Sequence, residues 1–119
     1  MASSTAKTVD LALPREVDVP RPGDVAEYLR HYPDIGRLLP RVCEAVLDRF
    51  GDRAQVVLDV YRDPEADDEY LAIEVRQEVY EAGTLRAIEG VSRGFEEELS
   101  ACNGWLLVTT DFRPPVPHR

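Results

Sequence analysis

Two runs of alternating apolar and polar residues, separated by an acidic segment, constrain the fold more than any other feature of the chain. In residues 55–61 and again in residues 70–76, an apolar side chain stands at every second position. This period is typical of a β-strand with one buried face, because successive side chains of a strand point to opposite faces. The intervening residues 63–69 hold five carboxylates and Pro64. The pattern therefore predicts a β-hairpin closed by a polar loop.

Two helical patterns precede the hairpin. Asp24, with Glu27 three residues later, predicts the start of a short helix that ends before Pro33. Over residues 34–50, apolar side chains recur at spacings of three and four, which indicates a second helix. Pro40 interrupts this stripe, so we expect a kink or a fresh start there.

A third helix and a third strand follow the hairpin. The helix is expected from about residue 82 until Asn103-Gly104, and residues 105–112 alternate as a strand. The order α-α-β-β-α-β is that of an α+β domain, a two-layer α/β sandwich. We expect the connection from the second strand through the helix to the third strand to be a right-handed crossover. We expect a three-stranded mixed sheet of order 2-1-3, with the helices on one face.

The size of the chain allows one domain with one modest core. At 119 residues and 44% apolar content, the composition is that of an ordinary globular protein. The expected single α+β domain spans residues 24–112. It lies between a flexible N-terminal arm (residues 1–23) and a flexible proline-rich tail (residues 113–119).

The net charge of −9 is concentrated in the second half of the expected domain. An acidic surface repels phosphate backbones and attracts basic proteins, and Lys7 is the only lysine, so nucleic-acid binding is disfavoured. Cys43 and Cys102 have no cysteine or histidine near them in the sequence, which fits a reducing compartment. With no membrane-span pattern and no signal-peptide pattern, we expect a cytoplasmic protein.

The helix-free face of the expected sheet is rich in aromatic residues, which indicates a binding surface. Its candidate interface residues are Val57, Asp59, Tyr61, Tyr70, Glu74, Arg76, Trp105, Leu107 and Asp111. Protein interfaces concentrate aromatic residues and arginine. We expect the N-terminal arm or an identical subunit, in a homodimer, to cover this face, with a different protein partner as the alternative. The acids on the face oppose an RNA-binding role.

One enzymatic alternative rests on Asp59 and on Glu74-Val75-Arg76. An Asp on the first hairpin strand and Glu-x-Lys on the second resemble the PD-(D/E)xK nuclease core, in which two carboxylates hold Mg²⁺ and a lysine helps to activate water. Arg76 stands where that lysine would be, and it stays protonated. An ion pair of Arg76 with Asp59 or Glu74 on a solvated face explains the same residues without a metal.

The acidic segment also offers a calcium interpretation. Four of its acids alternate as the ligands of an EF-hand loop do: Asp63, Glu65, Asp67 and Glu69. Glu74 falls at the twelfth position, but Asp68 stands where that loop needs glycine. A solvated loop that protects the sheet from aggregation explains the acids better. Because the chain also lacks a phosphate loop or a nucleophile motif, we expect no catalytic residue, metal or cofactor.

Three phrases of the sequence resemble those of a small prokaryotic family with no known activity. They are Tyr32-Pro33-Asp34-Ile35, residues 63–71, and residues 104–112. The resemblance implies a free-standing small domain and carries over no site residues. We expect a non-enzymatic, small acidic accessory module that binds protein, of the inhibitor or antitoxin kind. The alternative is a divergent Mg²⁺-dependent nuclease that uses Asp59 and Glu74.

Overall fold

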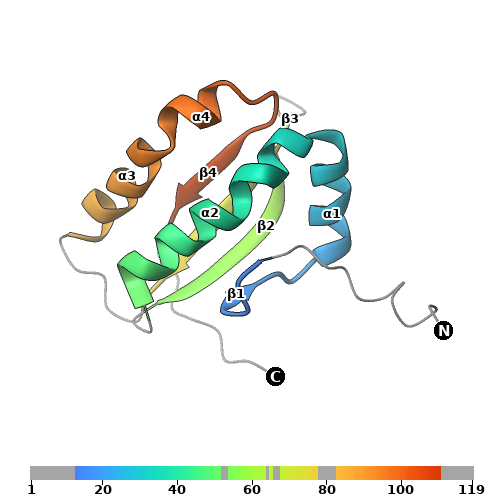
Figure 1. Ribbon diagram of the computed structural model, residues 1–119. Helices are drawn as coiled ribbons and strands as arrows, with labels where there is room; N and C mark the ends of the chain where they lie inside the picture. The colour runs from blue at the N-terminus through green and yellow to red at the C-terminus, as the bar shows by residue number, and fades with distance from the viewer. Residues whose placement is uncertain (1–12, 52–53, 64, 66–67, 78–82, 111–119) are drawn as a thin grey trace.

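The computed structural model describes residues 13–51, 54–63, 65, 68–77 and 83–110 (Figure 1). In chain order its elements are β1 (Val17–Asp18), α1 (Pro22–His31), α2 (Pro33–Phe50), β2 (Gln55–Asp63), β3 (Asp68–Arg76), α3 (Thr84–Gly94), α4 (Glu96–Ser100) and β4 (Leu106–Thr109). Helices and one mixed sheet make up the α+β class that the sequence predicted.

The sheet of the described chain has four strands in the order β1-β2-β3-β4. β2 and β3 form the predicted antiparallel hairpin, whose ladder runs from Gln55 opposite Arg76 to Asp63 opposite Asp68. β1 pairs with β2 and β4 pairs with β3, both in parallel. The predicted three-stranded order 2-1-3 is therefore wrong. It placed the last strand against β2, but β1 occupies that edge, so β4 extends the sheet from β3 instead.

β1 comes from the segment that was expected to be a flexible arm. Val17 lies opposite Val56 and is buried in the core, and α1 already begins at Pro22. Proline suits the first position of a helix, because its missing N–H would have no helical partner there. The described residues 13–23 thus pack with the domain, which differs from the expectation. The other parts of the expected arm and tail lie outside the described residues: 1–12 and 113–119.

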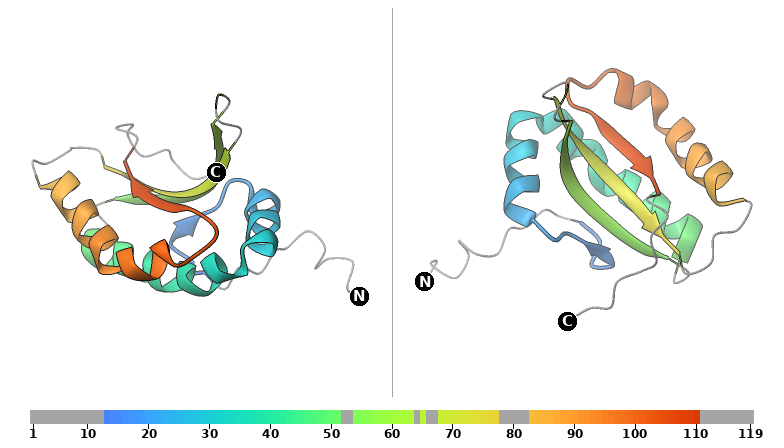
Figure 2. Two further views of the ribbon diagram at one scale, coloured as in Figure 1. Left: turned by 90° about the horizontal axis from the view of Figure 1, so that it is seen from above. Right: turned by 180° about the vertical axis from the view of Figure 1, so that it is seen from behind.

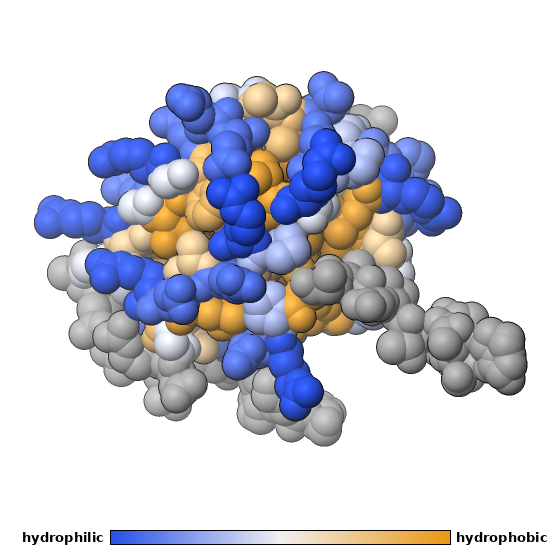
Figure 3. All heavy atoms as spheres, in the orientation of Figure 1, coloured by the Kyte–Doolittle hydropathy of each residue, from blue (hydrophilic) through white to orange (hydrophobic). Residues whose placement is uncertain are grey.

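The core lies between the sheet and the helices α2, α3 and α4, which cover one face, while α1 lies beside β2 (Figure 2). The strands direct these side chains into it: Val56, Leu58, Val60, Leu71, Ile73, Val75, Leu106 and Val108. From α2, Ile35, Leu39 and Val46 are completely buried against them. Full burial of such a side chain stabilises the fold by about 1.5–3 kcal/mol. Figure 3 views the helix side, where hydrophilic side chains stand outside this hydrophobic layer.

Two helices differ from the sequence pattern. α2 runs unbroken from Pro33 to Phe50 with Pro40 inside it, so the fresh start expected at Pro40 does not occur. An internal proline costs about 3 kcal/mol in a helix, but apolar side chains on both sides of it are buried and outweigh that cost. The single helix expected after the hairpin is divided into α3 and α4 at Phe95, whose φ of −117° is not helical.

Candidate functional site

The sheet face opposite α2–α4 has a buried centre and an exposed end. Val57, Asp59 and Glu74 lie in the central strands and are only 3%, 9% and 6% exposed. On β4 and just before it, Leu107 is 37% exposed and Trp105 is 54% exposed. The expectation that this whole face is open therefore needs correction, because its exposed apolar side chains lie at the β4 end only. Another candidate, Asp111, lies outside the described residues.

Asp59 is held by an arginine that the sequence pattern did not connect to it. The Nε of Arg21 donates to both carboxylate oxygens of Asp59, at 3.1 and 3.2 Å. The same guanidinium donates through Nη2 to the carbonyl oxygen of Val60 at 2.7 Å. The hydrogen bond with Asp59 raises the pKa of Arg21 above its ordinary value. The ion-pair partner of Asp59 is therefore Arg21 and not Arg76.

Glu74 is engaged by two neighbours on the same face. Its Oε1 accepts hydrogen bonds from the hydroxyl of Tyr61 at 2.7 Å and from Nη2 of Arg76 at 3.2 Å. Burial, followed by the hydrogen bond to Glu74, raises the pKa of Tyr61 well above its usual range. The expected ion pair with Arg76 is thus present at Glu74, along one strand rather than across two.

These contacts leave little for metal chemistry at Asp59 and Glu74. The register places Asp59 opposite Ala72, so Glu74 is its diagonal neighbour and not its direct one. Each carboxylate is already neutralised by a guanidinium, which a Mg²⁺ ion would have to displace. In the described ranges, no cluster of three or more His, Cys, Asp or Glu residues could hold a metal ion.

Three aromatic rings form a row across the sheet. Tyr61 lies directly opposite Tyr70, with ring centroids 5.9 Å apart, and Tyr70 contacts Trp105 at 5.0 Å. This aromatic row (Tyr61, Tyr70 and Trp105) runs from the hairpin toward β4, and its two tyrosines are half-buried while Trp105 is exposed. Offset rings at such distances stabilise a pair by about 0.5–1.5 kcal/mol beyond their burial. The row therefore orients the exposed indole.

The backbone of Trp105 is fixed by contacts with α1 and β3. The hydroxyl of Tyr28 accepts a hydrogen bond from the Trp105 N–H at 2.9 Å and donates to the Trp105 carbonyl at 3.3 Å. That carbonyl also accepts the N–H of Leu71 at 2.9 Å. Burial raises the pKa of Tyr28 above its ordinary value. Trp105 is therefore exposed at its side chain but held at its main chain.

The loop before Trp105 approaches the α1–α2 junction closely. A Cβ atom on Gly104 would come within 2.8 Å of Ile35 and 2.9 Å of Tyr32, so only glycine fits. One residue earlier, the N–H of Asn103 donates to Oδ2 of Asp34 at 2.9 Å, and this bond lowers the pKa of Asp34. The sequence pattern marked Asn103-Gly104 only as a helix stop. Nothing local in the sequence connects that pair to the α1–α2 junction.

The thiols and the histidine lie apart from this surface. Cys43 is completely buried in α2, and burial raises the pKa of its thiol to about 12. Cys102 donates to the Glu98 carbonyl at 3.3 Å, and His31 contacts Glu27 on α1 at 3.1 Å. These groups are not gathered into one site.

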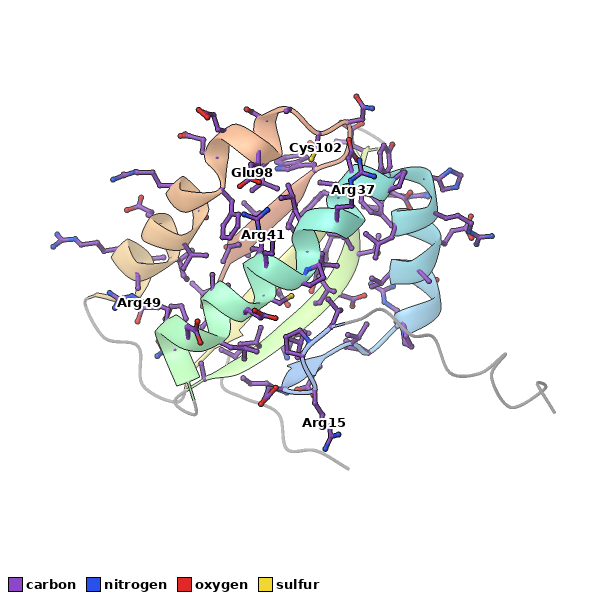
Figure 4. The ribbon with its side chains drawn as sticks, viewed as in Figure 1. Arg15, Arg37, Arg41, Arg49, Glu98 and Cys102 are labelled. Atoms are coloured by element: carbon purple, nitrogen blue, oxygen red, sulfur yellow. The ribbon has the colours of Figure 1, made fainter. Side chains whose placement is uncertain are left out.

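An arginine of α2 fixes the short helix α4. Figure 4 shows Arg41 reaching from α2 toward Glu98, whose Oε2 accepts its hydrogen bond at 2.9 Å. The same guanidinium lies 5.5 Å from the centre of the Phe95 ring. Both contacts hold α4 in place beside β4.

Two grooves flank the sheet. The first, of about 720 Å³ between α1 and β2, is lined by acids and bases that already pair, such as Arg62 with Glu69 at 3.1 Å. Its lining holds three acids and two arginines, so it offers a ligand only a small excess of negative charge. The second, of about 480 Å³, lies between α3–α4 and β4 and has an apolar lining next to Trp105 and Leu107. We call it the β4 groove.

Comparison with known proteins adds no relative, since no family model, curated protein or solved structure matches the chain. The resemblance to a prokaryotic family therefore stays a prediction. Across the residues that the structure describes, no helix combines the length and apolar character that crossing a bilayer requires.

Proposed function

We propose that the chain is a small acidic accessory module that binds a basic protein through the β4 end of its sheet. The observation that carries this proposal is the combination at Trp105 of a 54% exposed indole with a main chain held by Tyr28 and Leu71. A large aromatic side chain that is exposed and pre-positioned loses little freedom on binding. Such residues supply most of the affinity at protein interfaces.

Leu107 enlarges this anchor. It points to the same face as Trp105 and is 37% exposed. Together the two side chains form an exposed apolar patch, and the contact of such a patch with water is unfavourable. The partner that completes it must contribute apolar side chains of its own.

Charge supports a basic partner. The chain carries a net charge of −9, and on the nearby helices α3 and α4 four exposed acids outnumber two exposed arginines: Glu89, Glu96, Glu97 and Glu98 against Arg86 and Arg93. An acidic field of this kind attracts a basic protein and accelerates its association. An inhibitor or antitoxin-like role is the form of accessory function that fits such a pairing. Self-association through the same surface is the alternative outcome.

Affinity capture from the organism that encodes the chain tests the proposal. Trp105→Ser removes the anchor, and Leu85→Ser is the matched control because Leu85 is also 54% exposed but lies on α3. We expect the wild type and Leu85→Ser to recover the same stoichiometric basic protein and Trp105→Ser to lose it. Recovery of no protein by the wild type, or equal recovery by all three, contradicts the proposal. Sedimentation equilibrium of the purified chain separates a homodimer from a partner complex.

A further inference from the structure

β4 has an outer edge with which no described residue pairs. The order of the sheet places β4 at the end, next to β3 only. Because the N–H of Leu71 bonds to the Trp105 carbonyl, the main-chain groups of Trp105 and Leu107 face β3. N–H and C=O groups alternate in direction along a strand, so those of Leu106 and Val108 face outward. An edge of this kind is a template for an added strand.

The opposite edge of the sheet is closed. β1 pairs with Val56 and Val57 at the lower part of β2. Where β1 ends, the guanidinium of Arg21 bonds to the Val60 carbonyl at 2.7 Å. Folded proteins protect sheet edges in these ways when no partner is intended there. No described residue pairs with the outer edge of β4, which leaves that edge open to a further strand.

α3 and α4 project beyond β4 and cover the position that a further strand would take (Figures 1 and 2). The β4 groove lies under them. Its apolar lining includes Ile88 and Leu99 from the helices and Val108 from the strand. The rim carries two exposed acids, Glu89 and Glu96, and one exposed base, Arg93. The groove therefore combines free hydrogen-bonding groups, an apolar wall and acidic side chains.

We propose that an extended, basic segment of the partner protein adds to β4 as a further parallel or antiparallel strand and fills the β4 groove. This inference rests on the proposed function and specifies its mode of binding. Main-chain hydrogen bonds to Leu106 and Val108 supply affinity, and side chains at alternate positions supply specificity. The side chains that face the middle of the groove are apolar. Lysine or arginine beside them, on the same helix-facing side of the segment, meets Glu89 and Glu96 at the rim.

A second copy of the chain fits the edge less well. When two β4 strands pair antiparallel about a two-fold axis, both helix layers lie on the same side of the joined sheet. The α3 and α4 helices of each copy would then compete for the space over the other copy's β4 (Figure 2). The chain's own sequence after β4 is also unsuited to pair with the β4 edge, because Pro114, Pro115 and Pro117 have no N–H to donate to a hydrogen bond between strands. A separate basic segment has neither problem.

A short peptide that carries both lysine and valine on each face of the strand is the probe. Trp105 is the only tryptophan of the chain, so its fluorescence reports binding next to β4. We expect this peptide to bind, and a peptide of the same sequence with alternate main-chain nitrogens methylated to bind at least about tenfold more weakly, because methylation removes ladder donors. A glutamate–valine peptide is expected not to bind. Absence of binding by the lysine–valine peptide, or equal binding by its methylated form, overturns strand addition.

Reversing the charge of acidic residues tests whether those at the rim of the β4 groove attract the peptide. Glu89→Lys combined with Glu96→Lys is expected to weaken peptide binding about tenfold at low salt. Glu44→Lys combined with Asp48→Lys is the matched control, since both are exposed acids of α2 that do not line the β4 groove. Circular dichroism verifies that each variant folds. Equal weakening by both changes would show that overall charge, and not the groove, attracts the peptide, and would overturn the assigned position.

The outcomes separate this inference from the proposed function. If capture recovers a partner that Trp105→Ser loses, but the methylated peptide binds as well as the unmodified one, the chain binds protein without strand addition. If the peptides behave as expected and capture recovers nothing, the edge accepts strands but the proposed function fails. A dimer of the purified chain that the lysine–valine peptide dissociates would overturn the choice of a separate segment as the occupant.

Discussion

Replacing Tyr28 by phenylalanine removes one oxygen atom from the contact that fixes Trp105. The hydroxyl is the acceptor for the Trp105 N–H at 2.9 Å, whereas the Trp105 carbonyl keeps its bond from Leu71. The variant thus leaves one main-chain donor without its partner in a partly buried position. A loss of this kind costs about 1–2 kcal/mol, which lowers Tm by roughly 4–8 °C in a domain of this size. The apolar ring is retained, so no cavity beyond the hydroxyl is created.

The same substitution has a defined pH dependence. Burial raises the pKa of Tyr28 above its ordinary value, which is about 10 in an unfolded chain. The unfolded chain therefore releases this proton at lower pH than the folded chain does. The contribution of Tyr28 is complete below about pH 10 and is lost as the pH rises toward the folded pKa. We expect the stability difference between wild type and Tyr28→Phe to be constant at neutral pH and to shrink above pH 10.

Urea unfolding followed by Trp105 fluorescence measures both effects. Tyr32→Phe is the matched control, because the ring of Tyr32 packs against Tyr28 at 4.7 Å and its hydroxyl bonds to no residue that the structure describes. Tyr32→Phe should change the free energy of unfolding by less than about 0.5 kcal/mol. Equal stability of the two variants would refute the reasoning. So would a difference from wild type that does not shrink above pH 10.

Further substitutions and reagents test the close approaches and the buried thiol. Gly104→Ala should destabilise the domain by about 1–3 kcal/mol in urea unfolding, because its Cβ would lie 2.8 Å from Ile35. Gly90→Ala should instead stabilise α3 by about 0.5–1 kcal/mol, since nothing lies within 4 Å of the added carbon. Loss of stability in both would point to a general effect of alanine. For the thiols, a disulfide reagent at neutral pH should modify Cys102 and leave Cys43 unmodified until the chain unfolds, because burial excludes the reagent from Cys43 and raises its pKa to about 12. Rapid modification of both cysteines in the folded protein would contradict the packing of α2.

The hairpin and the helix-covered face follow directly from local periodicity. Alternation in residues 55–61 and 70–76 specifies both the strands and which side chains face the helices, because a one-residue shift would turn Leu58 and Ile73 to the opposite face. It does not indicate that Val57 and Glu74 on that opposite face are buried as well. The order of the strands does not follow from such patterns. It depends on β1, a pair of residues whose apolar member Val17 carries no periodic signal. The order of the strands is determined by the pairing of β1 with β2 in the folded protein.

The candidate site shows the same division between local and distant information. The ion pair of Glu74 with Arg76 could be predicted from the sequence, because residues two apart in a strand share a face. The contact of Arg21 with Asp59 joins residues 38 positions apart in the chain. The anchoring of Trp105 by Tyr28 joins residues 77 positions apart. Only the assembled fold brings such groups together, so neither Arg21 nor Tyr28 could be selected from the sequence.

The position of Arg21 has a consequence for any shortened form of the chain. A shortened chain that begins at Pro22 would lack the first strand of the sheet and the Arg21 guanidinium that bonds to the Val60 carbonyl. Asp59 would be left as a buried charge without a counterion, and β2 would become as bare as β4. A sheet with two open edges can pair at both, so we expect a chain that begins at Pro22 to polymerise more readily than the full chain.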